Sequence, residues 1–200
     1  MVRMGRIDLN TPISEEEIRR LRIGDHVFIN GRIFTARDAA HKRMMEYMSK
    51  KKRMPFSLEG SALYHCGPLV RKVKDKWVVL AAGPTTSMRM EPFEAEVIKN
   101  LGVRLVIGKG GMGEKTREAM KLYGAVYGAF TGGAAVIAAE HIRVLDVEWL
   151  DLGIPDAIWI FEAEDFGPLI VGMDSLGRSL YEETRGKALK NLNGIFEMII

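Results

Sequence analysis

The sequence predicts an α/β protein whose strands run both parallel and antiparallel. Between residues 103 and 142, strand-like and helix-like segments alternate, which is typical of parallel strands joined by helices. Before and after this region, short apolar runs separated by turn residues are typical of hairpins. The 200 residues contain no internal repeat, low-complexity segment or clear linker, so we expect a single domain over residues 1–200. Within it, residues 1–24 are expected to form an N-terminal arm with a short helix.

A helix cap and a turn signal predict the first elements. Ser14 and Glu17 have the spacing of a capping box, which indicates a short helix beginning at this point. Residues 26–36 contain two apolar runs around Asn30-Gly31, a dipeptide that strongly favours a two-residue hairpin turn. We therefore expect two short antiparallel strands here.

The next segments read as a helix, a second hairpin and another helix. Residues 36–52 place alanine, methionine and tyrosine on one face, which predicts a helix that packs on the core. Residues 61–70 and 75–83 are expected to be strands, with the Lys74-Asp75-Lys76 stretch between them as the turn. A further helix is predicted between Pro92 and Gly102, since proline favours a helix start and glycine a helix end.

The second half begins with the alternating region and ends in a hairpin pattern. The alternating strands and helices are expected at residues 103–108, 114–123, 125–130 and 132–142. Residues 157–163 are apolar enough for a buried central strand, and residues 167–174 are expected to pair with it across Glu164–Phe166. A polar helix near residues 178–191 and an apolar tail complete the chain.

Composition excludes several classes of protein. The net charge of +3 is too small to indicate nucleic-acid binding, and aromatic residues do not interleave with the basic ones. No apolar run reaches the roughly 18 residues that span a bilayer, so we expect no membrane segment. The start of the chain lacks the apolar core of a signal peptide, and Cys66 is the single cysteine, so a cytoplasmic protein is expected.

Three separate loops each combine a cation with hydroxyls or backbone N–H groups. They are TARDAAH (35–41) with Arg37, GPTTSMRM (83–90) with Arg89, and GKGGMG (108–113) with Lys109. Thr35 has the spacing of a cap for the helix after it, which places Arg37 in the first turn, where a cation opposes the helix dipole unless it faces an anion. If the three loops converge, they form a site for a small molecule with more than one carboxylate or phosphate.

Other interpretations of these motifs were weighed against an anion site. GKGGMG fits the dinucleotide fingerprint, but the next strand ends without the required acid and the helix opens with Glu114, so NAD binding is rejected. The pair Thr85 and Thr86 could simply cap the following helix. For His65 and Cys66 in YHCGP (64–68), a strand end with a buried thiol is the preferred interpretation.

Taken in order, TARDAAH, YHCGP, GPTTSMRM, GKGGMG and EDFGPLIVGMDSLG (164–177) resemble the β subunit of class I, iron–sulfur-dependent fumarate hydratases and of tartrate dehydratase. The likeness covers nearly the whole chain and implies a swivelling β/β/α domain. It also implies a hydro-lyase that is active only with an α subunit, in a heterodimer or heterotetramer. In that family the α subunit holds a 4Fe–4S cluster through three cysteines.

The resemblance implies a role for individual residues. Arg37 matches an arginine that grips a substrate carboxylate, Arg89 and Lys109 match further substrate-binding cations, and Thr85 matches the threonine proposed as the base. Thr86 and Gly110 belong to the same substrate-binding motifs, His41 and His65 are expected at the border of the site, and no metal ligand is expected in this chain.

The implied reaction is the reversible hydration of the dicarboxylate fumarate to malate. The dehydration of tartrate to oxaloacetate by a tartrate dehydratase is the alternative within the family. A non-catalytic module that binds small anions is the alternative from a different class.

Overall fold

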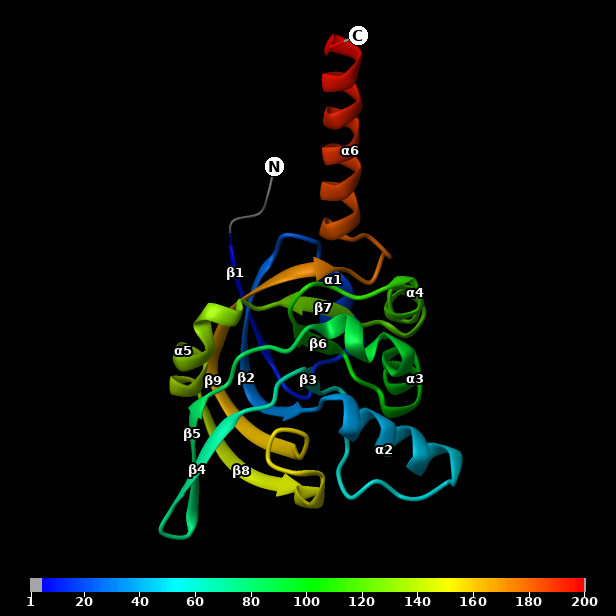
Figure 1. Ribbon diagram of the computed structural model, residues 1–200. Coiled ribbons are helices and arrows are strands. Elements are labelled where there is room, and N and C mark those ends of the chain that lie inside the picture. Colours follow the sequence, from blue (N-terminus) through cyan, green and yellow to red (C-terminus); the bar gives the residue numbers. More distant parts are fainter. Residues whose placement is uncertain (1–4, 200) are drawn as a thin grey trace.

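A seven-stranded mixed sheet forms the centre of the molecule (Figure 1). The computed structural model describes the backbone of residues 5–199 and the side chains of residues 5–192. The strands of the sheet, in spatial order, are β1 (Arg6–Asn10), β2 (His26–Thr35), β3 (Ala62–Tyr64), β6 (Leu105–Gly108), β7 (Val126–Ala129), β9 (Ile158–Met173) and β8 (Ile142–Glu148). Strands β4 (Leu69–Val73) and β5 (Lys76–Ala81) form a separate two-stranded sheet. The mixed α/β class predicted from the sequence is confirmed.

Five strands of the large sheet close into a ring. β2, β3, β6 and β7 run parallel, and β9 pairs antiparallel with both β2 and β7. Ile170 of β9 lies at the closure, where it pairs with His26 on one side and Ala129 on the other. β1 extends this ring beside β2, and β8 extends it beside β9. Closure leaves the ring itself without a free strand edge.

Residues of each ring strand alternate between two apolar cores, because successive side chains point to opposite faces. Leu105 and Ile107 of β6 join the core enclosed by the ring, together with Tyr64. Val106 of β6 joins a second core between the sheet and the helices, together with Leu63. Both faces of these strands are therefore covered, which explains why their sequences read as almost continuous apolar runs.

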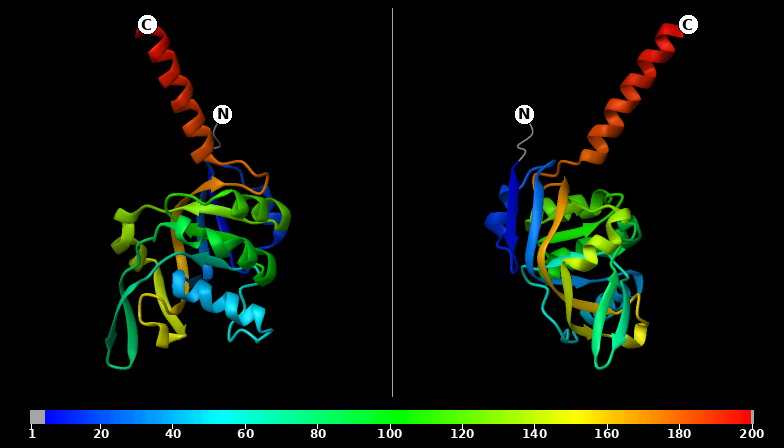
Figure 2. Two further views of the ribbon diagram at one scale, coloured as in Figure 1. Left: turned by 45° about the vertical axis from the view of Figure 1, so that its right-hand side comes forward. Right: turned by 90° about the vertical axis from the view of Figure 1, so that its left-hand side faces the viewer.

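The helices lie outside the ring. They are α1 (Glu15–Arg20), α2 (Asp38–Ser49), α3 (Glu91–Leu101), α4 (Glu114–Tyr123), α5 (Ala135–Glu140) and α6 (Leu180–Ile199), with short 3₁₀ turns η1 (Ser87–Met90), η2 (Gly132–Ala134) and η3 (Leu150–Leu152). Helices α2, α3 and α4 supply the apolar face of the second core. Figures 1 and 2 show α6 projecting away from the body of the molecule. No described helix has both the length and the apolar character that crossing a membrane requires.

The first turn of α6 is the part that contacts the body. The ring of Tyr181 lies across Gly172 of β9, where an added Cβ would be 3.0 Å from it. Glu182 forms an ion pair with Arg117 of α4. The helix therefore has a packed root and a projecting remainder.

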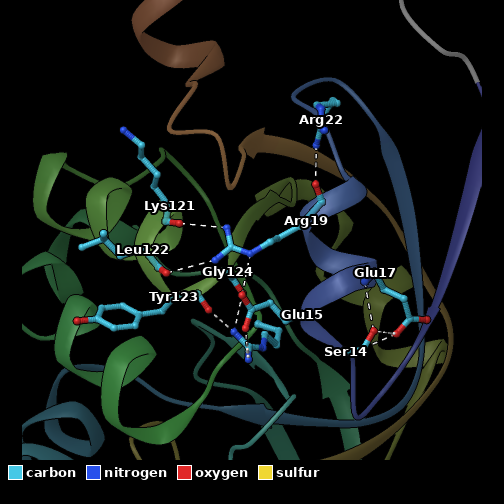
Figure 3. A network of polar contacts seen from close by, with 10 residues as sticks. Ser14, Glu15, Glu17, Arg19, Arg22, Lys121, Leu122, Tyr123 and Gly124 are labelled. Carbon is cyan, nitrogen blue, oxygen red and sulfur yellow. Dashed lines mark hydrogen bonds and ion pairs between the residues drawn. The ribbon is translucent and has the colours of Figure 1, made fainter.

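The N-terminal arm is tied to the end of α4. Ser14 and Glu17 form the predicted capping box of α1, in which the Ser14 hydroxyl accepts from the Glu17 N–H group at 3.2 Å. The guanidinium of Arg19 donates to the carbonyls of Lys121 at 3.1 Å and Leu122 at 3.2 Å, as Figure 3 shows. These carbonyls belong to the last turn of α4, where a cation complements the helix dipole.

The hairpin predicted at Asn30-Gly31 is wrong. Residues on both sides of this dipeptide pair with β9, so β2 is one strand, with register shifts on either side of Ile29. Gly31 has a φ of +92°, a conformation that favours glycine, and it lies at an irregularity in the pairing of β2 with β9. The same signal that marks a two-residue turn thus marks a bulge where a neighbouring strand continues past it.

The pairing predicted across Glu164–Phe166 is wrong for the same reason. β9 runs through this segment as a single strand of 16 residues, and Asp165 within it has a φ of +55°. Both halves of β9 find their partner in β2, so neither half needs to fold back on the other.

The remaining predicted elements are confirmed, missed or found with different bounds. The hairpin of β4 and β5, the left-handed Gly102 at the end of α3 and the parallel pairing of β6 with β7 are confirmed. β1 and β8 were not predicted, since their sequences carry many charged residues. The strand expected at residues 61–70 is divided between β3 and β4, α5 is shorter than expected, and α6 continues through the apolar tail.

Candidate active site

Four loops meet at one edge of the ring. The arginine loop (36–37) follows β2, the cysteine loop (65–68) follows β3, and the glycine loop (109–113) follows β6. These three parallel strands are neighbours, so their carboxyl ends lie side by side, the usual place for ligands in α/β sheets. The threonine loop (82–86) comes from β5, and β-bridges join it to the cysteine loop and the glycine loop.

Backbone hydrogen bonds hold these loops together. The Thr85 N–H group donates to the His65 carbonyl at 2.6 Å, and the Ser87 N–H group donates to the Lys109 carbonyl at 3.0 Å. Together with the ion pair between Arg89 and Asp38, the neighbour of Arg37, these bonds bring the three predicted loops together within this chain.

Arg37 is the N-cap residue of α2, whereas capping by Thr35 would have placed it two positions further into the helix. Thr35 does not cap the helix, because its hydroxyl accepts from the Trp159 N–H group at 3.0 Å. The Arg37 side chain crosses Gly67 of the cysteine loop, and its Nε lies 4.0 Å from the Asp156 carboxylate. This Nε is buried and has no hydrogen-bond partner among the described residues, so the guanidinium keeps unused donors.

Arg89 is already paired with a carboxylate. Its Nε donates to Asp38 Oδ1 at 3.0 Å, and its Nη2 donates to Asp38 Oδ2 at 2.5 Å. Asp38 is the first residue of α2, next to Arg37, so this bidentate pair connects η1 with the arginine loop. About half of the Arg89 side chain is exposed, which leaves its outer face open to a ligand.

The glycine loop presents Lys109 at the surface. Gly110 and Gly111 have φ values of +83° and +74°, which favour glycine. Lys109 is exposed, and its amine extends towards the loop after β7, where a Cβ added to Gly132 would lie 3.6 Å from Nζ. The cation of this loop is therefore free to face a ligand beside the threonine loop.

A carboxylate covers the helix N-terminus that follows the glycine loop. Glu91 accepts from the Gly113 N–H group at 2.7 Å, and from the Thr116 N–H group and hydroxyl at 3.3 and 2.7 Å. The amide groups at the start of α4 are thus partly satisfied from within the chain. Anion binding by this loop would rest on Lys109 rather than on the helix dipole.

Thr85 and Thr86 do not act as helix caps. Thr86 precedes η1 and Met90 precedes α3, and neither residue makes a side-chain capping bond. Thr85 is partly buried and Thr86 is exposed, in the loop that leads to Arg89. The simpler reading of the threonine pair is therefore wrong.

Two histidines and a glutamate lie fully buried beneath the loops. The Nε2 atoms of His41 and His65 each lie 2.9 Å from the same oxygen of Glu94, Oε2. Burial would raise the pKa of Glu94, but the two histidines outweigh it and hold that pKa at about 2. Burial also lowers the pKa of His65. The expected border residues thus lie behind the site rather than at its rim.

These three side chains are of types that bind metal ions, and their ligand atoms lie close together. The two 2.9 Å separations are hydrogen-bond lengths, whereas ligand atoms around a tetrahedral zinc lie about 3.3 Å apart. We therefore assign them as a hydrogen-bonded set. Spacing in the sequence gave no sign of this grouping.

Comparison with known proteins decides the family of the chain. Residues 2–184 match the family described as Fumarase C-terminus.

The chain belongs to the fumarase C-terminus family.

It is 42% identical over 192 residues to the L(+)-tartrate dehydratase subunit beta of Escherichia coli K12, which covers 96% of this chain and 94% of that one. A Methanocaldococcus jannaschii protein, provisionally named L(+)-tartrate dehydratase subunit beta, is 43% identical over 183 residues, or 90% and 94% of the two chains. A Geobacillus stearothermophilus protein, provisionally named fumarate hydratase class I, is 45% identical over 195 residues, or 96% of this chain and 37% of that protein.

The residues of this fumarase C-terminus chain do not fit an iron–sulfur cluster. Such a cluster is normally held by several thiolates, and the sequence has one cysteine. Cys66 is fully buried, and burial raises the pKa of its thiol to about 12, although the nearby Arg37 opposes this rise. A thiol that stays protonated in this way is a poor cluster ligand.

Sequence reasoning missed the groups that support this fumarase C-terminus site. They are the charged and hydroxyl side chains Asp38, Ser87, Glu91, Glu94 and Tyr127. One signal was available, since Glu94 shares the apolar face of α3 with Val97 and Ile98. A carboxylate among core positions of a helix predicts a buried partner.

Proposed function

We propose that this chain is the β subunit of a hydro-lyase that acts on a four-carbon dicarboxylate, with fumarate and malate as the pair. The observation that carries the proposal is that the loops bearing Arg37, Thr85 and Lys109 meet at one edge of the sheet, with Arg89 in η1 directly after the threonine loop, in a fumarase C-terminus chain. Three cations at one edge of the sheet match the charge of a dicarboxylate whose negative charge increases during the reaction.

Arg37 would bind one substrate carboxylate. Its side chain is held against Gly67, which orients the guanidinium before the substrate arrives. Its buried Nε has no hydrogen-bond partner among the described residues. A planar guanidinium offers two parallel N–H groups to a carboxylate, a geometry that an ammonium group cannot provide.

Arg89 and Lys109 would act on the carboxylate next to the carbon that loses its proton. Removal of that proton adds charge to the carboxylate, and preorganised cations stabilise the added charge more than the ground state. Asp38 fixes the direction of the Arg89 fork, and the bond from Ser87 to the Lys109 carbonyl fixes the start of the glycine loop. Thr86 and Gly110 would form the wall between these cations.

Thr85 would act as the base. A threonine alkoxide is unstable in water, so this role requires strong positive charge nearby. Arg89 follows Thr85 by four residues, and Lys109 is joined to the adjacent Thr86 by a β-bridge. The His65 carbonyl holds the Thr85 N–H group, which restrains the backbone of the base.

A separate α subunit would complete the site. The leaving hydroxyl requires a Lewis acid, and we assign the 4Fe–4S cluster that supplies it to that subunit, because this chain cannot hold one. Thr86, Arg89, Lys109 and Gly110 are exposed in this chain alone, so a second surface must exclude water from them. A swivelling movement of this single domain against the partner, within a heterodimer or heterotetramer in the cytoplasm, would open and close the site.

Tartrate is the second candidate substrate. The E. coli relative that matches this chain over 94% of its own length carries the name tartrate dehydratase, which favours dehydration of tartrate to oxaloacetate. The two substrates differ by a hydroxyl, which a few side chains can distinguish.

Co-expression with the cluster-bearing α subunit and anaerobic assays on fumarate, malate and both tartrate isomers would test the proposal. We expect turnover of one of these pairs and a loss of about 100-fold in kcat/KM for Arg37→Ala. Arg32→Ala is the matched control, since Arg32 is an exposed arginine in β2, the strand that leads to Arg37, and it should retain activity. Tight binding of a dicarboxylate without turnover of any substrate would support a non-catalytic anion-binding module instead.

A further inference from the structure

We propose that five buried side chains form a positioning network that fixes the loops of the active site. They are His41, His65, Ser87, Glu94 and Tyr127, all fully buried. The inference rests on the proposed function, because its consequence is the geometry of the substrate-binding residues. None of the five side chains needs to touch the substrate.

The network reaches every loop of the site. His41 Nδ1 lies 2.8 Å from the Arg37 carbonyl, in the arginine loop, and His65 belongs to the cysteine loop. Ser87 directly follows the threonine loop. At the far end, the Gly111 N–H group of the glycine loop donates to the Tyr127 hydroxyl at 3.3 Å. Glu94, from the middle of α3, joins the two histidines.

The chemistry of the end groups sets the direction of each bond. The Glu94 carboxylate can only accept, so His65 Nε2–H donates to it at 2.9 Å. Burial lowers the pKa of His65, so its Nδ1 is unprotonated and accepts from the Ser87 hydroxyl at 2.9 Å. Ser87 Oγ then accepts the Tyr127 proton at 3.0 Å, and the Tyr127 oxygen accepts from the Gly111 N–H group at 3.3 Å. His65 is therefore the neutral tautomer with its proton on Nε2.

At the other end, His41 donates from both ring nitrogens. The Arg37 carbonyl can only accept, so Nδ1 carries a proton, and Nε2 donates to the Glu94 carboxylate at 2.9 Å. His41 is thus an imidazolium paired with a carboxylate in the interior. If either His41 or Glu94 moved away, the other would be left as an uncompensated buried charge. The pair therefore favours a single arrangement of these two side chains.

The same residues also hold the backbone of the base. The His65 ring is fixed by Ser87 and Glu94, while its carbonyl accepts from the Thr85 N–H group. The Ser87 side chain bonds the ring, while its N–H group bonds the Lys109 carbonyl. Removing one hydroxyl in the middle of the network would therefore loosen the threonine loop and the glycine loop together. Misplacement of reacting groups by about 1 Å can cost about 100-fold in rate.

Nitrogen-15 spectra of the imidazole rings in the full chain test the proton positions without the partner. At neutral pH we expect two protonated nitrogens in His41 and a single proton, on Nε2, in His65. Glu94→Gln removes the countercharge, so His41 should lose one of its protons. A wild-type His41 with one protonated nitrogen, a His65 proton on Nδ1, or stoichiometric zinc in the purified chain would overturn the network.

Two serine variants separate positioning from simple stability. Ser87 and Ser61 are both buried, and the Ser61 hydroxyl donates to the Leu58 carbonyl at 2.7 Å, at the start of β3 and away from the loops. Both Ser→Ala changes should lower Tm by a few degrees. In the assembled enzyme, Ser87→Ala should lower kcat/KM about 10- to 100-fold, mainly through kcat, and Ser61→Ala should not.

Tyr127→Phe is the second test variant if Ser87→Ala fails to fold, because it removes one hydroxyl oxygen from the network and keeps the aromatic ring. It should also lower kcat with little change in KM. Wild-type kinetics in either network variant would overturn the positioning role. If the wild-type complex turns over no substrate, the proposed function fails, whereas the imidazole spectra still decide whether the network exists.

Discussion

Gly67→Ala should displace Arg37 and thereby weaken catalysis. An added Cβ would lie 2.8 Å from Arg37 Cδ and 2.7 Å from the Pro155 carbonyl oxygen, and Arg37 Nη1 would be closer still. Ordinary contacts between such atoms begin near 3.4 Å. Ordinary contact would require Arg37 Cδ to move by about 0.6 Å and Nη1 to move further, while the Pro155 carbonyl contact opens by about 0.7 Å.

This displacement corresponds to a loss of about 10- to 100-fold in kcat/KM, or about 1.4 to 2.7 kcal/mol of transition-state stabilisation. Gly67 does not have a left-handed φ, so the strain of the substitution comes from its contacts with Arg37 and the Pro155 carbonyl rather than from the backbone conformation of residue 67. Steady-state hydration kinetics of the anaerobically assembled enzyme would measure the loss, and thermal melting would confirm folding. The matched control is Gly5→Ala, where an added Cβ meets no atom within 4 Å. Unchanged kcat/KM in Gly67→Ala would refute the reasoning.

Four further outcomes follow from the same geometry. Arg37→Lys should lose at least about 10-fold in kcat/KM in the same assay, because an ammonium group cannot form the bidentate fork, and full activity would remove the carboxylate-binding role. Thr85→Ala should lower kcat far more than Thr86→Ala at nearly constant KM, whereas equal and mild effects would argue against Thr85 as the base. The isolated chain should fold, be colourless and lack hydro-lyase activity, and Cys66→Ser should leave the cluster absorbance and activity of the assembled enzyme unchanged; turnover by the chain alone would contradict the division of labour. The pKa of Glu94 is lowered from 4.5 to about 2, so its contribution to stability is present above pH 4.5 and is lost as pH falls towards 2. Urea unfolding across this range should show a shallower pH dependence in Glu94→Gln, and an identical dependence would refute the assignment.

Periodicity and caps in the sequence predicted most elements but not how the strands pair. The capping box of α1 and Gly102 at the end of α3 are local features, and the structure contains both. Asn30-Gly31 is equally local, yet a strand distant in sequence overrides it, because β9 pairs with β2 on both sides of the dipeptide. Turn chemistry alone does not distinguish a hairpin from a bulge in a continuous strand.

The candidate site was also predictable only in part. Arg37 and Lys109 follow the parallel strands β2 and β6, and parallel pairing brings such loops to one edge, so their meeting follows from the pattern. Arg89 comes from the chain after β5 of the separate sheet, so its place beside them does not follow from that pairing. The groups behind them do not follow from it, since the contacts of Glu94 with His41 and His65 span 53 and 29 residues. Only tertiary packing creates those contacts.

The root of α6 has a consequence for how such chains diverge. An alanine at position 172 would place its Cβ 3.0 Å from the Tyr181 ring, so that ring would have to shift by a few tenths of an ångström. We therefore expect these two positions to change together among relatives, whereas the outer turns of the helix are free of this constraint. The match to the fumarase C-terminus family ends at residue 184, shortly after Tyr181 and Glu182 contact the body. The part of α6 that the family match includes is thus its root, the part that packs on the body.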